Sequence, residues 1–280
     1  MSAIFRADLH CHSTYSDGEF SPEELIALAV RSGLQGLAIT DHDTVEAFAI
    51  AEPVARQAGL LLLPSCELST TLGEESVHVL AYSFHPSEGS IAAFCKEQQG
   101  RRTVRNREIL AKLAKRGFVL TEEEVSQVGR GVMGRPHIAQ AMVARGYVST
   151  VKEAFQNYLA EGKLCYAPGQ RVGTQEAIDL IHAAGGKAII AHPHLIQKTR
   201  LIRALTQLNF DGLEAYYAQF PLAQQQPWVK AAADKGWLAT GGSDFHGPSL
   251  KPHLVLGCSW TPEEAFRQLY DLYQMNALKY

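Results

Sequence analysis

Histidine and carboxylate side chains recur along this sequence in short motifs that could bind metal ions. The motifs are Asp8-Leu9-His10-Cys11-His12, Asp41-His42-Asp43, Cys66-Glu67, His192-Pro193-His194 and Asp244-Phe245-His246. Side chains two residues apart on an extended segment lie on the same side, so both imidazoles of a His-x-His motif can bind one cation. One such motif is a weak signal, whereas several in one chain indicate a metal centre.

The predicted ligands share imidazole or carboxylate chemistry, without thiolate, which suits manganese, iron or zinc. They are His10, His12, Asp17, His42, Glu67, His78, His192, Asp244 and His246. At roughly three or four protein ligands per ion, this set could hold about two or three ions.

Each motif lies in or directly after a segment that the sequence predicts to be a short strand. Predicted strands cover residues 4–9, 37–40, 60–64, 77–82, 187–191, 212–216 and 237–241. Helix signals separate them, such as Ser21-Pro22-Glu23-Glu24, in which Ser21 is the expected N-cap. Strands that alternate with helices are typical of parallel α/β folds. Seven strands favour a barrel, whose carboxyl strand ends would bring the motifs to one face.

Residues 97–171 depart from this alternation and are predicted to be entirely helical. They contain 13 Lys or Arg and 7 Asp or Glu, although the whole chain has a net charge of −3. We therefore predict a barrel formed by residues 1–96 and 172–280, with residues 97–171 inserted as a helical lid. An acidic body beside a basic insertion suits an anionic substrate. The alternative is a solvated helical surface that happens to be basic.

The cysteines and the N-terminal segment indicate in which cellular compartment the protein is expected. Five cysteines occur without a CxxC pair, which argues against a disulfide framework or a zinc ribbon. We find no secretory signal pattern, no apolar run of about 18 residues and no DNA-binding module. The expectation is a cytoplasmic protein without a membrane segment.

Together these motifs resemble those of the polymerase and histidinol phosphatase (PHP) family of metal-dependent phosphoesterases. The resemblance covers residues 4–96 and 172–280, and all four family motifs occur in order. It implies a distorted (β/α)7 TIM-like barrel with three divalent ions, manganese first and iron, zinc or magnesium as alternatives. It implies a first ion on His10, His12, Glu67 and Asp244, a second on Glu67, His78 and His192, and a third on Asp17, His42 and His246.

Within the family, the basic insertion with Gly134-Arg135-Pro136-His137 resembles the bacterial subgroup that acts on nucleoside 3′,5′-bisphosphates. The resemblance implies release of the 3′-phosphate to leave a nucleoside 5′-monophosphate, and trimming of short RNAs that carry a 5′-monophosphate. In the expected mechanism, water bridging two cations loses its proton near neutral pH, and the hydroxide attacks phosphorus.

Further residues are assigned roles around this centre. His194 is the candidate general acid and also a candidate substrate contact, and Asp244 is counted as catalytic as well as ligating. Arg135 precedes a proline that can open a helix, where backbone N–H groups and a guanidinium can bind the phosphate that is not cleaved. His137 is expected to touch substrate or to cap that helix, and Arg171 is a weaker substrate contact. The run Arg101, Arg102 and Arg105 is also a weaker candidate, because helical spacing favours a solvated face for these arginines with Val104 turned inward.

Other functions stay open at this point. One is a phosphatase of another small molecule, histidinol phosphate included. Another is a metal-dependent amide hydrolase, which uses the same ligand types, and a third is a metal-holding module without activity. The basic insertion argues against the amide hydrolase, and the complete ligand set argues against the inactive module.

Overall fold

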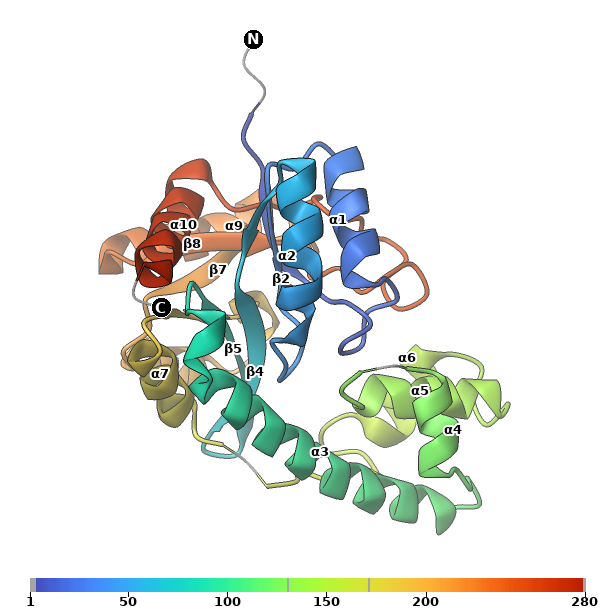
Figure 1. The fold of residues 1–280 in the computed structure, drawn as a ribbon. Coiled ribbons are helices and arrows are strands. Elements are labelled where there is room, and N and C mark those ends of the chain that lie inside the picture. Colours follow the sequence, from blue (N-terminus) through green and yellow to red (C-terminus); the bar gives the residue numbers. More distant parts are fainter. Residues whose placement is uncertain (1–3, 130, 171, 279–280) are drawn as a thin grey trace.

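The structure, a computed structural model, describes residues 4–129, 131–170 and 172–278. These residues form an α/β body, in which helices surround two sheets, and a helical lobe at the far end of the long helix α3 (Figure 1).

The first sheet is short, parallel and made of three strands. It runs in the order β1 (Ala7–Cys11), β2 (Gly36–Ile39) and β3 (Leu61–Leu63). The second sheet follows chain order through β4 (Ser65–Leu72), β5 (Glu75–Tyr82), β6 (Lys187–Ile190), β7 (Gly212–Tyr217) and β8 (Leu238–Gly242). Strand β5 is antiparallel to both β4 and β6, while β6, β7 and β8 are parallel.

This arrangement corrects two features of the predicted barrel. The described residues contain eight strands, because the unpredicted β4 pairs with β5 as a hairpin, and the strands are therefore not all parallel. The two sheets meet at isolated bridges, Cys11 with Phe245 and His42 with Glu67, so the described residues form no continuous closed ladder. Both bridges lie at strand ends that carry the metal-binding motifs.

Helices bury the outer faces of the sheets. Helices α1 (Pro22–Arg31) and α2 (Glu46–Ala58) pack on the first sheet, and Ser21 forms the predicted cap in a capping box with Glu24. Helices α7 (Thr174–Ala183), α9 (Leu222–Lys235) and α10 (Glu263–Ala277) pack on the second, and the short α8 (Thr199–Leu205) adds Leu201 and Leu205 to its core.

A separate apolar cluster fills the space between the sheets. It contains Leu9, Ala38, Leu63, Leu80 and Ile189 from five different strands, together with Phe266 and Leu269 of α10. Strands buried on both faces are mainly apolar, and these short strands are too, with Asp8 and His10 of β1 as buried polar exceptions. This filled interior holds the strand ends, and the side chains they carry, at fixed positions.

The lobe has its own core and is joined to the body through α3 (Ser90–Ala114). It contains α4 (Glu122–Gln127), α5 (Arg135–Ala144), α6 (Val151–Ala154) and a π-turn, Phe155–Leu159. Ile91 and Cys95 of α3 pack in the core of the body, whereas Ile109 and Leu113 pack in that of the lobe. The predicted boundary at residue 96 therefore falls within one continuous helix.

In the part of the chain that the structure describes, no helix is long and apolar enough to cross a bilayer.

Candidate metal centre

The predicted ligands converge at the strand ends. Ligand atoms lie within 4.8 Å of one another in three overlapping groups, which are His12–Asp17–His42–His246, His10–His12–Glu67 and His42–Glu67–His78. The other two predicted ligands adjoin these groups. His192 Nε2 lies 3.1 Å from Glu67 Oε1, and Asp244 Oδ1 lies 3.4 Å from His12 Nε2. All nine side chains thus lie in one cluster.

Glu67 is the centre of this cluster. Its Oε2 lies 3.2 Å from Nε2 of both His10 and His12 and 3.3 Å from His42 Nδ1. Its Oε1 lies 2.8 Å from His78 Nδ1 on the neighbouring strand. A carboxylate whose two oxygens face different sets of imidazoles has the arrangement needed to bridge two cations.

Local backbone geometry makes this convergence possible. A side chain on Gly242 would put its Cβ 2.4 Å from the Cβ of His10, so only glycine lets β8 approach β1 here. Asp43, His192 and Asp244 have positive φ values of 51°, 29° and 51°. Such conformations are uncommon outside glycine and cluster at functional sites.

A second layer of polar side chains holds the ligands. Glu214 Oε1 lies 2.9 Å from His10 Nδ1, and its Oε2 accepts the backbone N–H of His192 at 2.7 Å. Tyr217 donates to Asp244 Oδ2 at 2.7 Å, and Lys251 also forms an ion pair with that carboxylate. Fixing the far side of each ligand orients the atom that faces the cation.

Two buried aspartates fix the loops that carry the ligands. Asp8 accepts backbone N–H groups from His10, Ser243 and Gly257, and burial raises the pKa of Asp8 to about 6. Asp41 accepts hydrogen bonds from the backbone N–H of Ser13 and from the hydroxyls of Ser13 and Ser16. By accepting these hydrogen bonds, the two carboxylates hold the backbone and the hydroxyl groups around the ligands in place.

Carboxylates and imidazoles in the cluster strongly shift the pKa values of one another. Burial alone would raise the pKa of Glu67, but the surrounding imidazoles of His42, His78 and His10 hold it well below its usual value. Burial likewise opposes the effect of the carboxylates on His12, yet Asp244 and Glu67 raise the pKa of His12 to about 9. Protonated His10 and His12 thus compensate part of the carboxylate charge, whereas burial lowers the pKa of His42 well below its usual value.

Two buried nitrogen atoms show that these residues fit metal ions. His12 Nε2 and His42 Nδ1 are buried without a hydrogen-bond partner, although carboxylate oxygens lie 3.2 and 3.3 Å away. Buried polar atoms normally have partners, and these are too poorly aligned to form bonds with one another. They point into shared space, as ligands of a common ion would.

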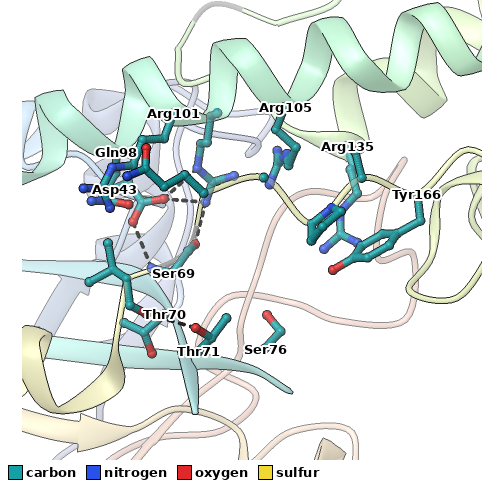
Figure 2. A pocket seen from close by; sticks show the side chains of 16 residues that line it. Asp43, Ser69, Thr70, Thr71, Ser76, Gln98, Arg101, Arg105, Arg135 and Tyr166 are labelled. Atoms are coloured by element: carbon teal, nitrogen blue, oxygen red, sulfur yellow. Dashed lines mark hydrogen bonds and ion pairs between the residues drawn. The ribbon is translucent and has the colours of Figure 1, made fainter. Parts of the chain in front are cut away.

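A pocket lined by arginines adjoins the cluster (Figure 2). It has a volume of about 70 Å³ and is lined by Arg101, Arg102, Arg105 and Arg135, with Asp43, Ser69 and Tyr166 among the other residues. Asp43 follows His42 in sequence, and Ser69 is paired across the β4–β5 hairpin with His78. The pocket therefore lies beside the His42–Glu67–His78 group.

The charges of this pocket are only partly compensated. Arg102 binds Asp43 at 2.5 Å and also donates to Ser69, and Arg101 pairs with Glu97. Among the described residues, no carboxylate forms an ion pair with Arg105 or Arg135. Burial, with Arg102 and Arg135 nearby, lowers the pKa of Arg105 to about 9, and Arg105 Nε has no hydrogen-bond partner. The positive charge of the pocket is therefore only partly paired among the described residues.

Comparison with known proteins places the chain in a family. The PHP domain family matches residues 8–164. The chain belongs to the PHP family. The 5′-3′ exoribonuclease Rnm of Escherichia coli is 35% identical over 276 residues, which cover 94% of this chain and 93% of that protein. The 3′,5′-nucleoside bisphosphate phosphatase of Chromobacterium violaceum is 31% identical over 86% of this chain and 87% of that protein.

A solved structure has the same fold as this PHP chain. A protein from Bifidobacterium adolescentis, described as a metal-dependent phosphoesterase, superimposes with a TM-score of 0.87 at 31% identity. The match covers 96% of this chain and 97% of that one. The predicted family and α/β fold are thus confirmed, and the clustered ligands agree with metal dependence.

The structure places the predicted substrate residues of this PHP chain in different surroundings. Arg135 lines the arginine pocket, with its guanidinium 5.5 Å from the centre of the Tyr166 ring. His137 is buried and accepts the backbone N–H of Gly134 at 3.0 Å, which is the helix-capping alternative. Arg171 lies outside the described residues.

His194 lies in an aromatic environment outside the three ligand groups. Its ring stacks 5.2 Å from Phe220 and 5.9 Å from Tyr217, and it packs at a tilt against Trp228. Burial lowers the pKa of His194 to about 4, and neither ring nitrogen has a hydrogen-bond partner. The roles of His194 as general acid and as substrate contact stay predictions.

Sequence reasoning missed most of the arginine pocket. Arg101, Arg102 and Arg105, which are only weaker substrate candidates from the sequence, line the pocket instead of a solvated helix face, and Val104 is 58% exposed instead of turned inward. The spacing of these arginines along α3 was the one feature of the sequence that could have indicated the pocket. The partners that make it a pocket, Ser69 and Tyr166, come from distant segments and carry no motif.

Proposed function

We propose that this PHP-family chain is a metal-dependent phosphoesterase that hydrolyses the 3′-phosphate of nucleoside 3′,5′-bisphosphates and leaves nucleoside 5′-monophosphates. The observation that carries the proposal is the arginine pocket beside the ligand cluster. A substrate with two phosphates can place one in each site.

The size and charge of the pocket favour a phosphate group over a larger anion. At about 10–15 Å³ for each water-sized group, its volume of about 70 Å³ accommodates roughly five to seven such groups. A phosphate has five heavy atoms, whereas a nucleoside is several times larger. Guanidinium groups bind phosphate oxygens through paired, charge-assisted hydrogen bonds. Arg105 and Arg135 are the side chains available for this role.

The nine clustered residues would hold the cations, with Glu67 bridging two of them. When bound, divalent ions would lower the pKa of water and compensate the charge of the phosphate under attack. The chain itself orients the ligands through Glu214 and Tyr217 and binds the uncleaved phosphate through its arginines. Binding the second phosphate fixes the position of the first relative to the cluster.

The similar proteins support this proposal, because they carry nucleotide-directed names: a 3′,5′-nucleoside bisphosphate phosphatase and a 5′-3′ exoribonuclease. Histidinol phosphate has one phosphate and would leave the arginine pocket empty. An amide substrate would give the arginines no anion to bind. Three manganese ions, a cytoplasmic location, a nucleotide partner and the segment boundaries stay predictions.

The test compares three substrates on the manganese-loaded protein. We expect phosphate release from adenosine 3′,5′-bisphosphate, with adenosine 5′-monophosphate as the other product. Histidinol phosphate should be hydrolysed with a much lower kcat/KM, and an N-acyl amino acid should not react. A higher kcat/KM for histidinol phosphate, or adenosine 3′-monophosphate as the product, would contradict the proposal.

A further inference from the structure

The lobe and its connecting helix α3 contact the body beside two ligands that belong to the same metal-binding group. The members of this group, named the Asp17 group, are His12, Asp17, His42 and His246. Asp17 follows strand β1, and His42 follows β2. The segments that contact the neighbours of Asp17 and His42 also carry Arg102 and Arg135 of the arginine pocket.

The first contact is made by Asp43, which directly follows His42 and lies between α3 and β4 (Figure 2). Its Oδ2 accepts a hydrogen bond from Arg102 Nε at 2.6 Å, and its backbone carbonyl accepts one from Gln99 at 2.9 Å. Its own backbone N–H donates to the carbonyl of Glu67 at 3.0 Å. Because Asp43 is buried and its φ is 51°, these bonds fix the backbone that carries His42.

The second contact is made on the loop that carries Asp17. Val132, just before α5, donates its backbone N–H to the carbonyl of Tyr15 at 2.9 Å. A side chain on Gly131 would put its Cβ 1.9 Å from the same carbonyl oxygen, so only glycine allows this approach. The lobe therefore lies directly on the backbone two residues before Asp17.

His137 of α5 extends the second contact to the residue next to Asp17. Its Nδ1 accepts the backbone N–H of Gly134 at 3.0 Å, so Nε2 carries the proton of the uncharged ring. The ring also forms a hydrogen bond with the backbone of Ser16, which directly precedes Asp17. His137 is buried, and a Cβ on Gly129 would lie 2.1 Å from its Cδ2, so the ring is closely enclosed.

We propose that Asp43 and His137 are positioning residues, which fix the Asp17 group relative to the arginine pocket. Each of them joins a neighbour of a metal ligand to a segment that carries a pocket arginine. The inference rests on the proposed function and adds that a phosphate in the pocket and a cation on the Asp17 group strengthen the binding of each other. A ligand that orders these segments favours the arrangement that the other ligand needs, and such coupling is reciprocal.

Electrostatics alone predicts the opposite effect for one of these contacts. A cation near a metal site opposes the binding of metal, so removing the charge of Arg102 should tighten manganese binding. Removing a positioning contact should weaken manganese binding, because Asp43 and the backbone that carries His42 are released. Arg102→Met therefore separates the two explanations by the sign of the change in Kd.

The test measures manganese binding by equilibrium dialysis of the full chain without nucleotide. Asp17→Asn first identifies the ion of the Asp17 group as the one whose Kd rises most. Arg102→Met and His137→Asn should each raise the Kd of that ion about fivefold or more. Asparagine at position 137 can keep the hydrogen bond to Gly134 but is too short to reach Ser16, so the helix cap is retained.

Two controls complete the test. Arg107→Met is matched to Arg102→Met, because Arg107 lies on the same helix but pairs with Glu122 at the surface, and it should leave the Kd unchanged. Inorganic phosphate should lower the Kd of the same ion about fivefold in the wild type and less than about twofold in His137→Asn. Phosphate that acts only by binding the ions directly would lower the Kd equally in both proteins, which would overturn the coupling.

An unchanged or lower Kd in a folded Arg102→Met or His137→Asn variant would overturn the inference for the contact that the substitution removes. Should Arg102→Met fail to fold, His137→Asn decides the inference alone. If adenosine 3′,5′-bisphosphate is hydrolysed but the Kd values stay unchanged, the inference fails while the proposed function stands. If the Kd values change as expected but the bisphosphate is not hydrolysed, the proposed function fails while the positioning role stands.

Discussion

Replacing Arg105 by methionine should stabilise the metal-free protein while weakening its binding of bisphosphates. Arg105 is a cation crowded by Arg102 and Arg135, and burial together with this crowding lowers its pKa from 12.5 to about 9. Since each pKa unit corresponds to about 1.4 kcal/mol, the unfavourable free energy has an upper limit of about 5 kcal/mol. Solvent screening of this partly exposed side chain reduces the recoverable part to about 2 kcal/mol.

The substitution also removes a favourable interaction of Arg105, which reduces the net gain in the free energy of unfolding. Arg105 donates a hydrogen bond to Asn106 at 3.0 Å, worth about 1 kcal/mol. The methionine stem can keep the contact of the arginine stem with Gly169. A net gain of about 1 kcal/mol should raise Tm by about 2–4 °C for a chain of this size. Losing a charged hydrogen-bond donor to the phosphate costs about 1.5–3 kcal/mol, which raises KM for the bisphosphate by roughly 10- to 150-fold.

Thermal unfolding measures the predicted rise in Tm, and steady-state kinetics measure the predicted rise in KM for the bisphosphate. KM for an aryl phosphate, which has no second phosphate, should change little in the same variant. Arg107→Met is the matched control, because Arg107 lies on the same helix but pairs with Glu122 at the surface. A lower Tm for Arg105→Met, with equal losses on both phosphate substrates, would refute the assignment of the arginine pocket as a phosphate site.

Three further perturbations address the ligand cluster. Glu67→Gln should lower the bound manganese by at least one ion per chain, measured by elemental analysis, and reduce kcat by about a thousandfold or more, since it removes the bridging carboxylate. Normal metal content would exclude Glu67 as a bridge. Asp244→Asn should abolish turnover while the circular dichroism spectrum stays that of the folded chain, and near-normal activity would remove Asp244 from the ligand set. Chelation should lower Tm, and manganese should restore it in a concentration-dependent way, because ions that bind only the folded state stabilise it; a Tm indifferent to manganese would argue against a preformed site.

The ligand cluster was predictable because it depends on local pattern and on strand direction alone. Motifs such as His10-Cys11-His12 follow short apolar strands, and the ends of such strands meet. Alternation placed His10 and His12 on one side and Cys11 on the other. In the structure Cys11 is fully buried in the core under α1 and α2.

Strand β4 was missed because its sequence does not look like a buried strand. The segment Ser65–Leu72 contains three hydroxyl residues in a row, and all eight of its residues are paired with β5. Gly73, with a φ of 64°, closes the hairpin. The consequence is functional, since Glu67 lies within this strand and faces His78 at a distance that a loop would not fix.

The arginine pocket was not predictable, for a different physical reason. Helical periodicity indicates which residues share a face but not which face is covered. Helical spacing predicts that Val104 is buried, yet α3 turns Arg102 and Arg105 toward β4 and leaves Val104 exposed. That choice depends on contacts between segments about 30 to 60 residues apart, such as Arg102 with Ser69 and Asp43.

The charge balance of the cluster connects these features to one another. Its ligands include three carboxylates, those of Asp17, Glu67 and Asp244, and six imidazoles. If three divalent ions bind, as the family resemblance implies, their six positive charges exceed the three carboxylate charges. A loaded centre would therefore attract the phosphate to be cleaved, and Arg105 and Arg135 attract the second one. Without metal, carboxylates raise the pKa of His10 and His12 against the effect of burial, so that protons replace part of the missing charge.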